Sequence, residues 1–543
     1  MSRASLGSSK RQSAASSTYE DAKLSETVTV TAASSTANSS PNPSWKPQSH
    51  PHPSPTSHGK PPTQPSALTP SPPAPTPFSL SLWDSNAAVA RARRAYIKLY
   101  LPGVFYITFI ILAVLSVFWG TLFRLPGRTV KGVVVDLGRG SDPEFSFDFD
   151  GGIIAQSLTR TVQSVEAAQL AQKTPRSIVS WTYVQQSDAQ ARFPGGVADV
   201  RRAIEEQEVF VAIAVSPGAS ARLLASVESP DAAYNGTLAI TAFGSEGRNE
   251  NAYRTYLFPH LVNTLNTFQN TFSVQFAAQH SADLTGASLQ QLLQTSPQTL
   301  VLPAGFTIVN VFPFFQPIAT APVFTGLIFV LILAFFTVLV ANGARLGSGL
   351  NRLLTLRSLI ALRFCSAAAI YLFFSLIYSL LNLMFGVRLT HTFGHAGFVL
   401  FWLGTWIYML AVGLVLESWV ILFKQNTPFF FFPWLVVNLS VGVYPLEMLP
   451  KFYHYGYAAP YYNITRIVRT IVFGTRNSLG LNYGVLLTWV LIGTLNMSAV
   501  QWYVRRQDIM ALRKAAAAAS TPSDADAEKA NVRPGMETAG SKS

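Results

Sequence analysis

The sequence predicts an α-helical polytopic membrane protein with six transmembrane helices and an α/β exported domain between helices 1 and 2. Three observations support this fold class. Hydrophobic residues make up 49% of the 543 residues and charged residues only 12%, whereas soluble domains carry about 25% charged residues. The apolar residues collect in six runs, each long enough to cross a bilayer. Between the first and second runs, residues 124–320 are long enough for one domain with its own core.

The first apolar run, residues 99–123, contains no charged residue and is followed by Arg124. About 20 such residues in a helix span the hydrocarbon core of a bilayer. Five further runs satisfy the same length criterion, at residues 322–342, 362–384, 398–422, 429–449 and 484–504. The fifth run is the least regular, because Pro433, Asn438 and Pro445 interrupt it.

The basic residues indicate the orientation, since Lys and Arg collect on the cytosolic side of membrane proteins. With a cytosolic N-terminus, the cytosolic flanks of the six runs hold 13 Lys and Arg and the opposite flanks hold 8. We therefore expect both termini in the cytosol, including a tail at 505–543, and residues 124–320 on the other side. This asymmetry also accounts for the net charge of +13, so we expect no nucleic-acid partner.

The N-terminal segment, residues 1–90, is expected to be a disordered cytosolic tail. Of its first 80 residues, 42 are Ser, Thr or Pro. Such a composition buries too little apolar surface to offset the entropy lost on ordering the chain.

The exported segment shows strand-like and helix-like patterns. Runs rich in β-branched residues predict strands at 130–137, 177–184, 209–215 and 238–243. Residues 251–280 repeat apolar side chains at steps of three and four, which predicts an amphipathic helix. Asn235-Gly-Thr is an acceptor sequence for N-glycosylation in a predicted turn.

Residues 450–483 are expected to form an aromatic interfacial or re-entrant segment that contains an amphipathic helix. Tyr and Phe are dense at 452–462, as at a membrane–water interface. Apolar residues then recur at helical spacing from Ile464, and Arg466 and Arg469 face away from them. This pattern is typical of a short helix that lies in the outer interface or enters it part-way.

A few polar residues within the predicted spans are candidates for a transport path. Glu417 is an acidic residue within the fourth span, and a charge at membrane depth is expensive enough to suggest function. Alternatively, Glu417 pairs with Lys424 near the cytosolic end, or with Arg363, which could also be a simple interface anchor. Asn438 and Asn496 could line a polar path or form hydrogen bonds between helices.

No chemistry of catalysis is visible in the sequence. We expect no catalytic residues, cofactor or metal site, because no Walker motif is present and the pair His391 and His395 lacks a third ligand. A membrane-embedded enzyme would need clustered acid, base or nucleophile side chains. The protein is therefore expected not to be an enzyme.

Three stretches resemble a known family: 117–126 with Val133-Val-Val-Asp, 233–236 with Ser245-Glu-Gly-Arg-Asn-Glu, and 452–475. Together they resemble the fungal nitrosoguanidine-resistance family (domain-of-unknown-function 3533 type), which is related to the membrane components of ABC-2-type exporters. The resemblance covers roughly residues 95–510. It implies a multi-pass protein of the plasma membrane, or alternatively of an endomembrane, that associates with lipids and forms a homodimer.

The resemblance and the spans favour one function and leave an alternative of another class. The first is a contribution to drug or toxicant tolerance, by export of a small-molecule toxicant or by a change in membrane permeability. The alternative is a non-transporting scaffold or regulator of plasma-membrane lipid organisation.

Overall fold

The computed structural model describes residues 80–123, 125–138, 152–171 and 177–520. Every helix and strand below belongs to one compact unit, Leu82–Ser543. Most of the expected N-terminal tail, and residues 521–543 of the C-terminal tail, lie outside the described residues.

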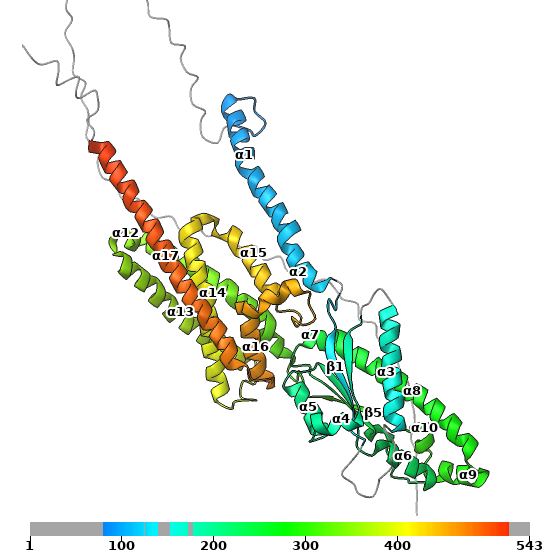
Figure 1. Cartoon of the computed structure of the whole chain (residues 1–543). Helices are drawn as coiled ribbons and strands as arrows, with labels where there is room; N and C mark the ends of the chain where they lie inside the picture. The colour runs from blue at the N-terminus through cyan, green and yellow to red at the C-terminus, as the bar shows by residue number, and fades with distance from the viewer. Residues whose placement is uncertain (1–79, 124, 139–151, 172–176, 521–543) are drawn as a thin grey trace, which may run out of the picture. The chain divides into compact units, whose positions relative to one another are not determined.

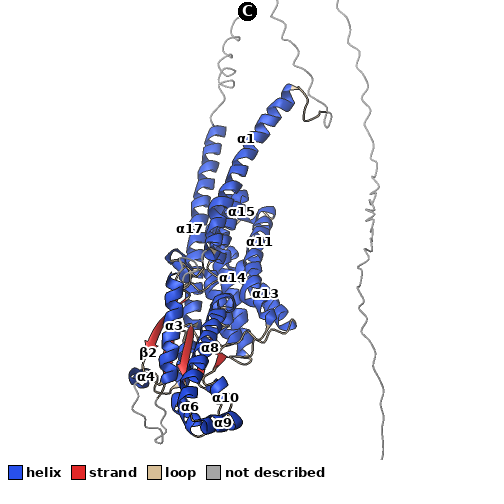
Figure 2. Ribbon diagram, turned by 90° about the vertical axis from the view of Figure 1, so that its right-hand side faces the viewer, coloured by secondary structure: helices blue, strands red, loops and turns tan. Residues whose placement is uncertain are grey.

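A five-stranded sheet forms the centre of the sheet domain, which we define as residues 130–310 (Figures 1 and 2). Its strands are β1 (Val130–Asp136), β2 (Val179–Val184), β3 (Val211–Val215), β4 (Ile240–Gly244) and β5 (Phe306–Asn310). Their order in the sheet is β2-β1-β3-β4-β5, and only the β3–β4 pair is antiparallel. The four strands expected from the sequence are thus present, and β5 is a fifth.

Helices cover both faces of this sheet because its strands are apolar on both sides (Figure 1). Along β1, Val130 and Val134 pack into one core and Val133 and Val135 into the other, as expected for side chains that alternate along a strand. The first core is covered by α3 (Ile153–Ala171), α6 (Ala219–Glu228), α8 (Phe258–Asp283) and α10 (Gln298–Val301). The second is covered by α4 (Gln186–Arg192) and α5 (Val197–Glu205).

The amphipathic helix expected at 251–280 is confirmed. It begins as α7 (Glu250–Ala252), passes through a π-helical turn η3 (Tyr253–Leu257) and continues as α8. Its apolar stripe packs into the first core and includes Leu261, Leu265, Phe268, Phe272 and Phe276. The remaining short elements of the domain are η2 (Gly236–Leu238) and α9 (Gly286–Thr295).

Long apolar helices make up the rest of the described chain (Figure 2). The helix before the sheet domain runs through α1 (Ala87–Phe109), η1 (Ile110–Val114) and α2 (Leu115–Leu122). After the domain come η4 (Pro317–Ala319), η5 (Ala321–Thr325), α11 (Gly326–Gly347), α12 (Leu350–Leu353), α13 (Leu356–Met384) and α14 (Ala396–Phe423). The last are η6 (Lys424–Asn426), α15 (Thr427–Ser440), η7 (Lys451–Ala458), α16 (Pro460–Phe473) and α17 (Leu479–Ser520).

Five helical stretches among the described residues are long and apolar enough to cross a membrane, whereas the sequence predicted six. The difference lies at 429–449. There α15 has 14 residues, or about 21 Å, which is shorter than the roughly 30 Å hydrocarbon core. The helix ends at Ser440, before Gly442 and Pro445, and it joins α14 in one stretch, Ala396–Ser440. The other helices extend beyond the predicted spans at one or both ends.

Helix α14 lies at the centre of the bundle and contacts α11, α13, α15, α16 and α17. Residues 408–418 are buried consecutively, so α14 is covered on every side. Helix α1, in contrast, has no buried residue. Close packing onto α14 depends on small residues: the hydroxyl of Tyr371 lies where a side chain at Gly413 would be.

The sheet domain contains a buried histidine that makes its stability depend on pH. Burial lowers the pKa of His260 in α8 from 6.5 to about 4. The unfolded chain therefore binds a proton between these two pH values and the folded domain does not, so acidification favours unfolding. We expect the domain to lose up to about 3 kcal/mol of stability as the pH falls from 6.5 towards 4.

His260→Phe should flatten this loss while keeping the stacking on Trp181. Thermal unfolding of the full chain in detergent at several pH values measures it, with the exposed His395→Phe as the matched control. An unchanged pH slope in His260→Phe would contradict the assignment.

Candidate functional site

Three charged side chains from three helices meet inside the bundle. We call Arg345 of α11, Arg363 of α13 and Glu417 of α14 the bundle cluster. Nη2 of Arg345 donates to both carboxylate oxygens of Glu417, at 2.9 and 2.8 Å, and Nη1 of Arg363 donates to Oε2 at 2.6 Å. All three side chains are at most 5% exposed.

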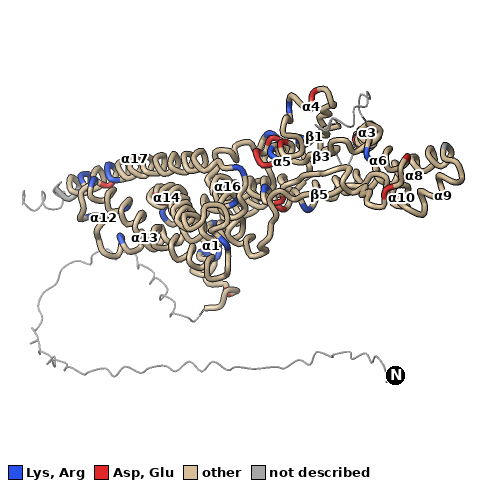
Figure 3. Tube along the Cα trace, turned by 90° about the horizontal axis from the view of Figure 1, so that it is seen from below, with Lys and Arg blue, Asp and Glu red and all other residues tan. Residues whose placement is uncertain are grey.

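The bundle cluster lies near the helix ends that face away from the sheet domain. Glu417 precedes the end of α14 by six residues and Arg363 follows the start of α13 by seven. At 1.5 Å per residue, both lie within about 10 Å of those ends. Further Lys and Arg residues mark this end of the bundle, near α12 and α17 (Figure 3).

The bundle cluster has a net charge of +1, because two guanidinium groups share one carboxylate. The Nε atoms of both arginines are buried and have no hydrogen-bond partner in the described part of the chain. Removing a charge from water costs several kcal/mol per ion, which an ion pair must offset. A buried cluster with surplus positive charge and spare donors is suited to attract an anionic group.

The other two polar residues expected in the spans do not join the bundle cluster. Asn438 is buried in α15, where its side-chain amide donates to the carbonyl of Trp434. Asn496 lies on the exposed face of α17. The side chain of Asn438 is thus bonded within its own helix, and the side chain of Asn496 faces outward.

A second polar cluster joins the sheet domain to the bundle. We call it the junction, and its charged members are Glu246, Arg248, Glu250, Arg254, Glu447, Arg466 and Arg469. At its centre, Arg469 of α16 lies 2.6 Å from Oε2 of Glu250, with both side chains less than 10% exposed. Arg469 also donates to the carbonyl of Gly247 at 3.1 Å. Burial alone would raise the pKa of Glu250, but Arg469, together with a backbone hydrogen bond and Arg254, lowers the net pKa below its usual value.

Arg248 forms the next part of the junction. It donates to Glu447 at 3.2 Å and to the carbonyls of Gln207 and Val209, both at 3.3 Å. Its guanidinium lies 3.4 Å from the centre of the Phe210 ring, a close cation–π contact. Burial lowers the pKa of Arg248 to about 10, so the residue stays charged at neutral pH.

Glu246 forms the part of the junction that contacts the chain between β5 and α11. Its carboxylate accepts hydrogen bonds from Asn310 at 3.0 Å and from the backbone N–H of Phe314 at 2.8 Å, and it pairs with Arg254. The chain leaving β5 is thereby fixed to the loop after β4. Asn249 adds a bond to the carbonyl of Val443, at 3.2 Å.

Helix α16 is buried, whereas the sequence indicated a helix at the lipid interface. Twelve of its 14 residues are buried. Its apolar stripe packs against α14 and α17, and Arg466 and Arg469 face the sheet domain instead of lipid headgroups. Arg466 donates to the side chain of Gln207 at 2.8 Å. Arg466 and Arg469, which the sequence indicated at the lipid interface, make contacts of the junction instead. Gly474, with φ +74°, ends the helix.

Asn235, the expected glycosylation residue, is exposed on the sheet domain. Its side-chain oxygen accepts hydrogen bonds from the N–H and hydroxyl of Thr237. The acceptor sequence is therefore accessible at the surface.

These features define a polytopic helical membrane protein with a sheet domain held onto its bundle by buried charges. The chain belongs to the family described as a protein of unknown function, DUF3533, whose model matches residues 103–495. An uncharacterized endoplasmic reticulum membrane protein of Saccharomyces cerevisiae, YJR015W, is 26% identical over 314 residues, which cover 56% of this chain and 61% of that protein. The chain thus spans about three-fifths of that relative's length. No solved structure matches.

Sequence reasoning found Glu417, Arg363, Arg466 and Arg469 but missed several of their partners. Arg345 lies outside the predicted span 322–342, while the structure extends α11 through Gly347 and buries Arg345. Glu250 was noted only within the stretch that resembles the family. The signal that could have found it is the excess of arginine in α16, because a buried cation requires a nearby anion.

The Arg469–Glu250 pair should be much more important for stability than an exposed pair. Arg469→Gln leaves Glu250 buried without its counter-charge, which typically costs about 3–5 kcal/mol. We expect a lower unfolding midpoint for the full chain in detergent, with partial recovery when Glu250→Gln is added.

The matched control is Arg201→Gln, which breaks an exposed pair with Glu205 in the same domain. Such pairs contribute about 0.2–1 kcal/mol. Equal decreases in the unfolding midpoint for Arg469→Gln and Arg201→Gln would contradict this prediction.

Proposed function

We propose that this protein is a membrane component of ABC-2-exporter-like organisation that contributes to tolerance of toxic compounds. It does so by exporting them or by changing the permeability of the membrane. The observation that supports this proposal best is the placement of α16. This helix lies between the sheet domain and the bundle and is fixed to both. The Arg469–Glu250 ion pair and the Arg466–Gln207 hydrogen bond hold it to the domain, and apolar packing holds it to the bundle.

This placement couples the two parts mechanically. Movement of the sheet domain pulls on Arg466 and Arg469, and these side chains lie on the helix that packs against α14 and α17. Helix α14 also carries Glu417. The junction, through α16, and the bundle cluster are therefore both connected to α14. Closely packed interfaces respond to small shifts by discrete rearrangement, which is what a transport or gating cycle needs.

A second candidate is favoured by the packing of α14. Eleven consecutive residues of α14, from 408 to 418, are buried. A closely packed centre suits a scaffold or regulator of lipid organisation. In that role the sheet domain binds a partner and the bundle is a stable anchor.

We further propose a six-span arrangement in which α15 and the loop after it return the chain to the sheet-domain side. Tyr106 in the first helix contacts the carbonyl of Phe429, and Tyr453 donates to the carbonyl of Val117, so this segment follows the first helix along much of its length. The unburied α1 is where lipids and a second copy in a homodimer would contact the protein. Residence in the plasma membrane or an endomembrane fits this architecture, and the name of the yeast relative favours the second.

The test complements a deletion strain with the wild-type gene, with Glu417→Gln or with a triple variant of the bundle cluster. Glu417→Gln should express poorly, because two buried arginines lose their counter-charge. The triple variant Arg345→Met, Arg363→Met, Glu417→Leu should fold, since apolar replacement of a buried ion cluster is often neutral or stabilising. If the bundle cluster has a function, the triple variant should be stable but fail to restore toxicant tolerance.

Toxicant accumulation and outer-leaflet lipid exposure are measured in the same strains. A deletion that changes accumulation supports the proposal, whereas altered lipid exposure alone favours the scaffold. A deletion with normal tolerance and normal accumulation would overturn the first proposal.

The orientation has a separate test at Asn235. If the sheet domain is exported, the full chain should carry an N-glycan that is removed by a glycosidase and absent from Asn235→Gln. Asn463→Gln is the control, because Asn463 is buried in α16 and inaccessible. Absence of an N-glycan from the wild-type chain would contradict export of the sheet domain.

A further inference from the structure

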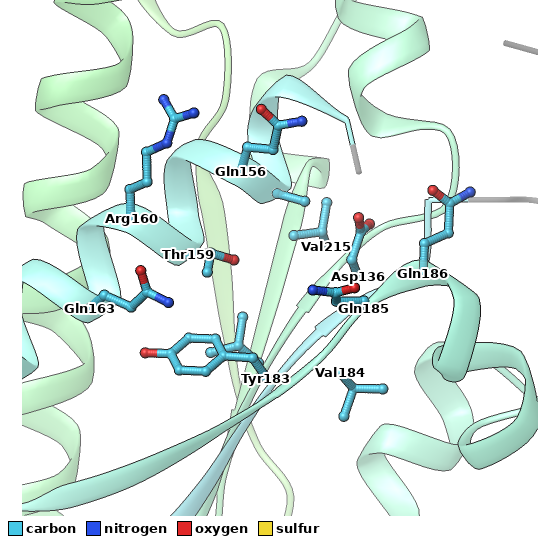
Figure 4. Close-up of a pocket in the computed structure, with 12 residues that line it drawn as sticks. Asp136, Gln156, Thr159, Arg160, Gln163, Tyr183, Val184, Gln185, Gln186 and Val215 are labelled. Carbon is cyan, nitrogen blue, oxygen red and sulfur yellow. The ribbon is translucent and has the colours of Figure 1, made fainter. Parts of the chain in front are cut away.

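The sheet domain contains a cavity of about 410 Å³ at one edge of its sheet (Figure 4). It lies between α3 and the ends of the three parallel strands. Asp136 is the last residue of β1, Val184 the last of β2 and Val215 the last of β3, and all three line it. The size is within the usual range for small-molecule sites.

The position of the cavity follows from the topology. Strand β1 has β2 on one side and β3 on the other. The chain passes from β1 to β2 through α3, and from β2 back across β1 to β3 through α4 and α5, so these two connections run in opposite directions along the sheet. In open sheets of parallel strands, the crevice at the carboxyl ends opens where the order reverses in this way, and ligands bind there.

The polar groups in the cavity come from β1, β2 and α3. Asp136 is partly buried, accepts one hydrogen bond from the N–H of Gly138 at 3.0 Å, and forms no ion pair with any described residue. Thr159 and Gln185 point towards the same space (Figure 4). Burial raises the pKa of Asp136, and hydrogen-bond donors on a ligand would offset that loss of solvation.

Tyr183 supplies an apolar surface in the same cavity. Its ring lies along the wall (Figure 4), and its hydroxyl is 3.5 Å from Glu166, which limits rotation of the side chain. The lining contains one carboxylate, Asp136, and one cation, Arg160. A single carboxylate is a poor metal site, and opposed charges favour a neutral ligand that is rich in hydrogen-bonding groups.

The cavity faces away from the bundle. The amino ends of β1 and β3 lie at the bundle, because Gly127 and Arg128 donate to the carbonyl of Met448 and Gln207 contacts Arg466. The carboxyl ends are the opposite edge, about 20 Å away along the seven residues of β1. A ligand must therefore come from water, not from the headgroups of the surrounding lipid.

We propose that this cavity binds a sugar ring, either free or at the end of a glycan. The carboxylate of Asp136 accepts hydrogen bonds from two neighbouring hydroxyl groups, Thr159 and Gln185 bind the others, and the ring of Tyr183 packs against the apolar face of the sugar. This site is independent of whether the bundle transports anything.

Binding to the full chain in detergent is measured calorimetrically with D-mannose, D-glucose and N-acetyl-D-glucosamine. Inorganic phosphate and choline are the anionic and cationic comparisons. At least one sugar should bind saturably at millimolar or lower concentration. Asp136→Asn should weaken that sugar by about tenfold or more, because hydrogen bonds to a charged group are among the stronger ones, and Thr159→Val should weaken it less.

Glu228→Gln is the matched control, since it removes the same charge from an exposed position in α6. It should leave affinity unchanged, and equal unfolding midpoints should show that the variants are folded. A mannose-terminated oligosaccharide that binds more tightly than the free sugars identifies a glycan as the source, and equal affinity identifies the free sugar. Absence of saturable sugar binding, tighter binding of phosphate or choline, or unchanged affinity in Asp136→Asn would each overturn the proposal.

Discussion

The ion pair between Arg469 and Glu250 is the interaction on which the arrangement of this molecule depends. Helix α16 is buried on nearly all sides, and a guanidinium in such a position is tolerated only beside an anion. That anion comes from the loop after β4, so α16 and the sheet domain need each other. The contact between them explains the conformations of the aromatic segment before α16 and of residues 245–250, which neither segment explains by itself. Glu250 and Arg469 lie in two of the stretches that resemble the family, 245–250 and 452–475.

The buried charged side chains of the described bundle and of its contact with the sheet domain lie in two places. The junction lies at the sheet-domain end of the bundle and the bundle cluster lies near the other end, with the apolar centre of α14 between them. Local ion pairs offset part of the cost of burial in each place, although the Nε atoms of Arg345 and Arg363 have no partner among the described residues. The packing of α14 against α16 connects the two places.

The sequence predicted the elements whose signal is local, and it missed what depends on distant partners. Strands β1 to β4 were predicted as β-branched runs, whereas β5 was not predicted although it carries the same signal in Thr307, Ile308 and Val309. Apolar length predicted five of the spans, yet it could not show that α15 stops at Ser440. Glu417 was predictable as an acidic residue within a span. Its pairing with Arg345 was not, because that required knowing that α11 continues to Gly347.

The sheet links the two ends of the domain in a way that constrains how it can work. Strand β3 begins just after Val209, whose carbonyl binds Arg248 at the junction, and ends at Val215 in the cavity. A strand paired on both sides does not change length, so a ligand in the cavity can move the sheet only as a rigid body. The contacts that yield first to such a movement are side chains, not backbone ladders. The side-chain contacts of Arg248, Arg466 and Arg469 are therefore the part of the molecule where a change in the domain would reach the bundle.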